Sequence, residues 1–213
     1  MKKLLLASAA LAILFASPPL RADDTPIARV PAVTESDPDP SVKEMFDQAR
    51  ARGTKPINLQ LITHLSPALA KARSQEANTI RFDLKVPRPY RELTILRTVQ
   101  NWEGNYEFNQ HRAMALACGF TQAQIDGLSG WKYNSLFDET QQALLAYVDE
   151  LTVKPGRVDD QTFAALATHF KPDEIVELTS VSTFYMGGAA FSNAMKLRTE
   201  TDGRQAEIGT CAH

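Results

Sequence analysis

The hydrophobic positions of this chain recur with the period of helices. Over most of its 213 residues, apolar side chains return every three to four positions, whereas no stretch of useful length alternates apolar and polar residues. Capping boxes, prolines and glycines divide this pattern into segments. The expected helices are 41–53, 58–64, 67–80, 139–153, 160–170 and 172–197, with one from Pro89 to Trp102, one from Gly104 to Gly119 and a short one that opens at Thr121. The pattern therefore predicts a single all-α domain.

The first residues have the pattern of a secretory leader. A basic start precedes an apolar run at 4–15, which is too short to span a bilayer as a stable helix, and Ala22 is a suitable cleavage point. We expect export, to a bacterial periplasm or beyond. The expected organisation is a signal peptide at 1–22, an extended arm at 23–40, a helical domain at 41–198 and a tail at 199–213, with both ends of the mature chain mobile.

The charge balance argues against nucleic acid and anionic membranes as partners. Three of the 23 basic residues lie in the leader, which leaves 20 basic residues against 25 acidic ones in the mature chain. A net negative charge without a basic patch provides no electrostatic attraction for either partner. No second apolar run is long enough to cross a membrane.

Two of the apolar helix faces carry titratable side chains. Glu92 shares its face with the apolar residues three, four and seven positions later, where a carboxylate is costly unless it is paired or protonated. Glu107 and His111 are four residues apart and are therefore neighbours on one helix face. Such groups indicate acid–base chemistry, although helix ends, subunit contacts and core histidines produce the same pattern.

Three stretches around these residues occur together. They are an Arg-Glu-Leu helix start at 91–97, a Tyr-Glu-Phe step at 106–108 and a histidine that leads into a glycine-ended helix at 111–120. In combination they resemble the carboxymuconolactone decarboxylase family, which includes the AhpD-like alkylhydroperoxidases. The resemblance implies an AhpD-like helical fold and assembly into a trimer or hexamer.

The redox members of that family carry a Cys-x-x-Cys pair just before the histidine. The matching positions here are Gly104 and Glu107, neither of which is a thiol. A disulfide-cycling peroxidase needs a reactive thiolate at such a place. The residues that do match are Glu92 and His111, which the resemblance assigns to a proton relay. The chain therefore looks more like the thiol-free, decarboxylase-type branch, which acts on small cyclic or unsaturated acids.

The leading hypothesis is cofactor-free acid–base catalysis, by decarboxylation or isomerisation of a small acid or lactone. His111 would carry the proton, and Glu107 would orient its ring. Glu92 would be the second acid or base if burial raises its pKa, and Tyr106 would donate a hydrogen bond. The candidates for binding an anionic substrate are Arg91, Arg97 and Arg112.

Three alternatives remain open. A peroxiredoxin-type hydroperoxidase would have to use Cys118, which lies seven residues after His111 and about 10 Å away along the helix. A metal site would use Glu92, Glu107 and His111, which is fewer ligands than usual, so we expect no metal. A non-enzymatic binding protein would keep the pocket without the chemistry.

Two further features have more than one interpretation. Export would permit a disulfide between Cys118 and Cys211, but the preferred interpretation is a small buried hydrophobic residue and a tail thiol. The pair Gly187-Gly188 weakens its helix. It indicates either a kink or the close approach of another helix or a ligand.

Overall fold

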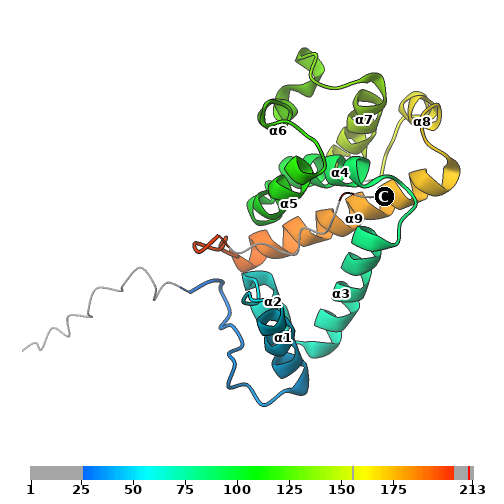
Figure 1. The fold of residues 1–213 in the computed structure, drawn as a ribbon. Helices are drawn as coiled ribbons and strands as arrows, with labels where there is room; N and C mark the ends of the chain where they lie inside the picture. Colours follow the sequence, from blue (N-terminus) through cyan, green and yellow to red (C-terminus); the bar gives the residue numbers. More distant parts are fainter. Residues whose placement is uncertain (1–25, 155, 204–210, 212–213) are drawn as a thin grey trace, which may run out of the picture.

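The computed structural model describes residues 26–154, 156–203 and Cys211. Its helices are α1 Pro40–Ala51, α2 Asn58–Thr63, α3 Pro67–Phe82, α4 Arg88–Asn101, α5 Asn105–Ala117, α6 Gln122–Gly127, the 3₁₀ helix η2 Leu128–Tyr133, α7 Glu139–Val153, α8 Asp160–Ala167 and α9 Pro172–Met195 (Figure 1). No strand occurs in these ranges, so the prediction of a single all-α domain is confirmed. The expected leader lies outside the described residues. None of the helices in the described ranges is both long and apolar enough to span a membrane.

The helix boundaries follow local capping chemistry. Thr121 and Asp138 cap α6 and α7 with their side chains, as the sequence predicts. The first helix begins earlier than expected, because the Asp39 side chain accepts a hydrogen bond of 2.8 Å from the amide of Ser41 and Pro40 suits the first turn. The 3₁₀ helix η2 was not predicted.

The helix α4 lies at the centre of the core. Its residues Leu93 and Leu96 belong to one buried cluster with Leu144 and Leu145 of α7, and the opposite side of α4 packs against α9. Figure 1 shows α9 as a long diagonal, with α4 to α8 on one side of it and α1 to α3 on the other.

Close helix packing explains two glycines. A Cβ atom added to Gly104 would lie 2.7 Å from the Cβ of Ala189, so the start of α5 approaches α9 only because residue 104 has no side chain. Gly188 is buried beside Glu107, whereas Gly187 faces open space. The helix α9 continues unbroken through both residues. The structure therefore favours close approach over a kink at this glycine pair.

The N-terminal arm is extended but not free. The amide of Arg29 donates to the carbonyl of Met195 at 2.8 Å, and the amide of Val33 donates to the carbonyl of Leu61 at 3.0 Å. Ala28 and Val33 are buried. The arm from residue 27 to residue 33 thus packs against α2 and the end of α9, contrary to the expectation of a mobile segment.

The two cysteines form a disulfide. Cys118 follows the last residue of α5, and its Cα atom lies 5.1 Å from that of Cys211 in the tail. The preferred interpretation of two separate thiols was therefore wrong. Sequence spacing could not reveal the pairing, because 93 positions separate the two residues. The bond ties the C-terminal tail to the end of the helix that carries Glu107 and His111.

Candidate active site

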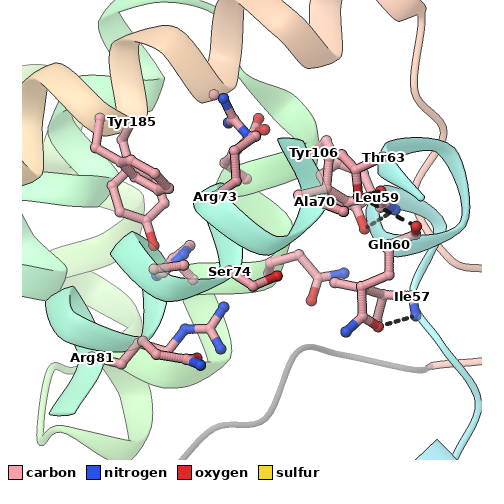
Figure 2. Close-up of a pocket in the computed structure, with 17 residues that line it drawn as sticks. Ile57, Leu59, Gln60, Thr63, Ala70, Arg73, Ser74, Arg81, Tyr106 and Tyr185 are labelled. Carbon is pink, nitrogen blue, oxygen red and sulfur yellow. Dashed lines mark hydrogen bonds between the residues drawn. The ribbon is translucent and has the colours of Figure 1, made fainter. Parts of the chain in front are cut away.

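A cavity lies between α3, α5 and α9, with α2 closing one end (Figure 2). Its volume of about 130 Å³ is close to that of cavities which admit a single benzene-sized ring. The side chains that face it include Ile57, Leu59, Gln60, Arg73, Ser74, Asn78, Arg81, Tyr106, Glu107, Gln110, His111, Phe184 and Tyr185. The cavity brings together three of the predicted catalytic residues, Tyr106, Glu107 and His111.

Glu92 stands behind His111 rather than in the cavity. Its Oε2 atom accepts a hydrogen bond of 2.8 Å from Nδ1 of His111, and its Oε1 atom accepts one of 3.2 Å from Nε of Arg88. All three side chains are buried. This arrangement fixes the orientation of the His111 ring and places the proton on Nδ1, since a carboxylate can only accept.

The pKa of Glu92 moves in the opposite direction from the one expected. Burial alone raises it, but the charges and hydrogen bonds of His111 and Arg88 outweigh burial, and the pKa of Glu92 is lowered overall. Glu92 is therefore ionised and paired near neutral pH. The raised pKa on which its predicted role as the second acid or base depended is therefore not found, and the contacts of Glu92 hold His111 in place.

Glu107 is the second buried carboxyl group of the site, and it lines the cavity. Only 5% of the residue is exposed, and its Oε1 atom accepts a hydrogen bond of 2.5 Å from the hydroxyl of Ser192. Its Oε2 atom is buried and has no hydrogen-bond partner among the described residues. Burial raises the pKa of Glu107, and Ser192, His111 and Arg73 compensate only in part. A carboxyl group with a raised pKa thus faces the cavity.

Two arginines that the sequence analysis missed line the cavity from α3. The guanidinium of Arg73 lies 5.4 Å from the ring centre of Phe184 and 5.5 Å from that of Phe191, and in the described ranges it makes no hydrogen bond. Burial raises the pKa of Tyr185, and the charge of the neighbouring Arg81 opposes that rise. The buried Nε atom of Arg81 finds no partner in those ranges. Figure 2 shows both arginines on α3, with Tyr185 reaching in from α9. One wall of the cavity is therefore cationic.

The three arginines proposed as substrate ligands lie elsewhere. Arg91 is buried and donates to the carbonyl of Ile80 at 2.6 Å. Arg97 pairs with Asp149 at 2.5 Å, and the exposed Arg112 donates to Gln122 at 2.8 Å. None of the three lines the cavity. The four-residue spacing of Arg73, Ala77 and Arg81 places them on one helix face, and this was the sequence signal for the two arginines that line the cavity.

The hydroxyl of Tyr106 is engaged at the cavity wall. It donates to Oε1 of Glu200 at 2.8 Å and accepts from the amide of Leu59 at 3.2 Å. Burial, followed by the charge of Glu200, raises the pKa of Tyr106 above its usual range. Tyr106 is thus part of a fixed hydrogen-bond network, which a residue in the tail completes.

The metal hypothesis finds no support in the donor arrangement. In the ranges that the structure describes, no group of three or more His, Cys, Asp and Glu side chains is placed to hold a metal ion. At the predicted metal site, both carboxylate oxygens of Glu92 are occupied, one by Arg88 and the other by His111.

Substitution of Gly188 by Ala should weaken ligand binding without loss of stability. The added Cβ would lie 3.7 Å from Oε1 of Glu107, which is an ordinary contact. Alanine should stabilise α9 by about 0.5–1 kcal/mol, while its methyl group should raise Kd or KM about tenfold. Gly187→Ala is the matched control, because nothing lies near that position. Equal binding by the two variants would show that ligands do not reach this wall.

Comparison with known proteins was made by sequence and by structure. No family model matches the chain. The protein YnjA of Escherichia coli K12, itself uncharacterized, is 30% identical over 70 residues, which are 33% of this chain and 38% of the E. coli protein. The match therefore spans less than half of that relative.

Solved structures match over most of the chain. A peroxidase-related protein from Ralstonia eutropha JMP134, described as an alkylhydroperoxidase AhpD core, superposes with a TM-score of 0.73 at 17% identity, over 84% of this chain and 95% of that one. The apo debrominase Bmp8 superposes with a TM-score of 0.67 at 16% identity, over 84% of this chain and 95% of Bmp8. A peroxidase-related protein from Silicibacter sp. TM1040 gives 0.70 at 13% identity, over 84% and 93%. At these identities the similarity establishes the fold alone, and the chain has the all-helical fold of the AhpD core.

Proposed function

We propose that this protein is an acid–base enzyme that transfers a proton on a small organic acid or lactone, during decarboxylation or double-bond isomerisation. The observation that carries the proposal is the Oε2 atom of Glu107, a buried carboxyl oxygen without a partner among the described residues and in a group that lines the cavity. A carboxyl group whose pKa is raised by burial is better suited to hold and donate a proton than an exposed one.

The proton path can be written with two cavity residues. In an isomerisation, ionised Glu107 takes a proton from the carbon beside a carbonyl, the electron pair moves into a dienolate, and Glu107 returns the proton to the far carbon. In a decarboxylation, the electrons of the breaking carbon–carbon bond form an enolate as CO₂ leaves, and protonated Glu107 supplies the proton. His111, whose Nδ1 proton is donated to Glu92, would present the lone pair of its other ring nitrogen as a second proton acceptor.

The cationic wall supports an anionic substrate. Guanidinium groups pair with carboxylates in a bidentate manner. The guanidinium of Arg73 lies over the rings of Phe184 and Phe191, and its donors make no hydrogen bond in the described ranges. Arg73 and Arg81 are eight residues apart on α3, which is about 12 Å along the helix axis. One of the two arginines would bind the carboxylate of the substrate, and the other would face the opposite end of the substrate.

The size of the cavity favours a single ring or a short chain. A related fold holds a ligand of that size, since a variant of the debrominase Bmp8 was solved in complex with 2,3,4-tribromopyrrole. Only the ligand size is carried over to this chain, because the identity to that structure is 16%.

No observation favours a thiol peroxidase at this site. Both cysteines of the chain are joined in the Cys118–Cys211 disulfide. Neither of them lines the cavity, whereas Glu107 does. We therefore favour proton transfer over hydroperoxide reduction as the function of this site. The experiment must also distinguish proton transfer from ligand binding without turnover.

Solvent deuterium exchange tests the proposal directly. Small unsaturated acids and lactones would be incubated with the protein in D₂O and followed by NMR, and CO₂ release would be measured in parallel. We expect deuterium at the carbon beside the carbonyl of at least one compound. Stabilisation by a compound without exchange would indicate a binding protein. Consumption of hydroperoxide with a dithiol, but no exchange, would overturn the proposal.

Two arginine variants separate the cavity from the surface. Arg73→Met should raise KM about tenfold or more, because a charged hydrogen bond to the substrate is lost. Arg112→Met should leave KM unchanged, since Arg112 is exposed and does not line the cavity. The opposite result would move the substrate to the outer face of α5.

A further inference from the structure

The start of α2 depends on groups from other parts of the chain. A helix leaves its first amide groups without internal partners, and Ile57 at the capping position has no side-chain oxygen to offer them. The amide of Asn58 instead donates to Oε1 of Glu200 at 2.7 Å, and the amide of Leu59 donates to the hydroxyl of Tyr106 at 3.2 Å. The tail residue Glu200 thus acts as the cap of a helix 142 positions earlier in the chain.

The same carboxylate also binds α5. Glu200 accepts a hydrogen bond of 2.8 Å from the hydroxyl of Tyr106 through Oε1, and one of 2.6 Å from the side-chain Nε2 of Gln110 through Oε2. Tyr106 and Gln110 line the cavity, as do Ile57 and Leu59 at the start of α2. One carboxylate therefore connects the two walls that close this end of the cavity.

Covalent and backbone contacts hold the tail in place around Glu200. The side chain of Asn58 donates to the carbonyl of Arg198 at 2.9 Å, and the amide of Arg198 donates to the carbonyl of Ile27 at 2.9 Å. Further along, Cys211 is bonded to Cys118 at the end of α5. The tail thus contacts α5 twice, near its start through Glu200 and at its end through the disulfide.

We infer that Glu200 is a positioning residue for the cavity and that the Cys118–Cys211 disulfide keeps it in place, so that reduction of the disulfide lowers ligand affinity. While the bond is intact, a released Glu200 stays close to Tyr106 and Gln110 and rebinds, because both flanks of the tail are anchored. After reduction, only the flank that precedes Glu200 is held. The inference rests on the proposed function, in that it takes the cavity as the substrate site.

The redox step requires a dithiol. One thiolate of the dithiol attacks a sulfur of the disulfide to form a mixed disulfide, and its second thiol then displaces the protein sulfur. Two electrons and two protons pass to the cysteines, which become thiols, and the dithiol leaves as its own cyclic disulfide.

Amide exchange gives the first test, because the amides of Asn58 and Leu59 take part in the network. We expect Glu200→Gln, and wild-type protein treated with dithiothreitol, to exchange these two amides about tenfold faster than oxidised wild type, through the loss of a charge-assisted bond. Amides of α4 should be unchanged, which would exclude general unfolding. Glu76→Gln, which removes an exposed carboxylate of α3, is the charge control.

Benzoate affinity gives the second test, since its ring and carboxylate match the size and charge of the cavity. Glu200→Gln and reduction of the disulfide should each raise the Kd for benzoate about tenfold. A Cys118→Ser/Cys211→Ser variant should bind benzoate weakly, and its Kd should not change when the dithiol is added. Unchanged exchange and affinity in Glu200→Gln would overturn the positioning role. If Glu200→Gln changes amide exchange and affinity but reduction of the wild type changes neither, the role of the disulfide would be overturned. Failure of oxidised wild type to bind benzoate would count against the proposed anion site, while amide exchange would still decide the role of the tail.

Discussion

Glu107→Gln should abolish most of the proton-transfer activity and at the same time stabilise the protein. Glutamine keeps the shape and can still accept the hydrogen bond from Ser192, but it cannot exchange a proton with a substrate. We expect kcat to fall about 10²- to 10⁴-fold, as is usual when a general acid or base is removed. The free energy of unfolding should rise by about 1–3 kcal/mol near neutral pH and above, because burial penalises the charge of the carboxylate and glutamine carries no charge.

The pH dependence of that stabilisation has a definite sign. The pKa of Glu107 is higher in the folded protein than in the unfolded chain, so the stability it contributes is fully present below the unfolded pKa and is lost as pH rises through the folded pKa. The difference between Glu107→Gln and wild type should therefore be small in acid and grow with pH. Urea unfolding at a series of pH values measures it, with Glu76→Gln as the exposed control. A difference that does not depend on pH would mean that Glu107 is ionised without cost.

Removal of Glu92 should have the largest effect on stability. Glu92→Ala leaves Arg88, which is 2% exposed, and His111, which is 4% exposed, without their shared acceptor. Loss of one member of a buried ion pair typically costs about 3–5 kcal/mol. The pKa of Glu92 is lowered in the folded protein. Its contribution is therefore present above the unfolded pKa and is lost as pH falls through the folded pKa.

Thermal and urea unfolding of Glu92→Ala would check this prediction, with Glu92→Gln as the milder variant if the alanine variant does not fold. Glu44→Ala is a suitable control, since Glu44 contacts Gln48 at the same four-residue spacing but on an exposed face. Its effect should stay within about 0.5 kcal/mol. If Glu92→Ala unfolds at the wild-type midpoint, the Arg88–Glu92–His111 cluster does not stabilise the fold.

Periodicity and capping predicted the helices because both depend on residues close together in the chain. The helix α7, for example, begins and ends where Asp138 and the apolar spacing indicate. The roles of Glu92 and Glu107 could not be assigned in this way. Their pKa values depend on which of them meets Arg88 and His111 and which meets only Ser192, and those contacts are made between helices.

The residues that were missed also act over long distances in the chain. Arg73 and Arg81 belong to a helix without any motif, and they form a site only because α3 lies across the cavity from α9. Glu200 lies in a polar tail that periodicity describes as unstructured. Its importance comes from partners such as Asn58 and Tyr106, which are 142 and 94 positions away.

The cap that Glu200 provides to α2 has a consequence for biosynthesis. Chains are made from the N-terminus and fold in that order, so α2 leaves the ribosome 142 residues before its cap is synthesised. The core of α4, α7 and α9 contains no residue beyond position 195 and can pack first. A nascent chain, or a product truncated before residue 200, should therefore hold a native core around an unfinished cavity. If Glu200 has the positioning role inferred above, the cavity reaches its full affinity for a ligand only when the last part of the chain is in place.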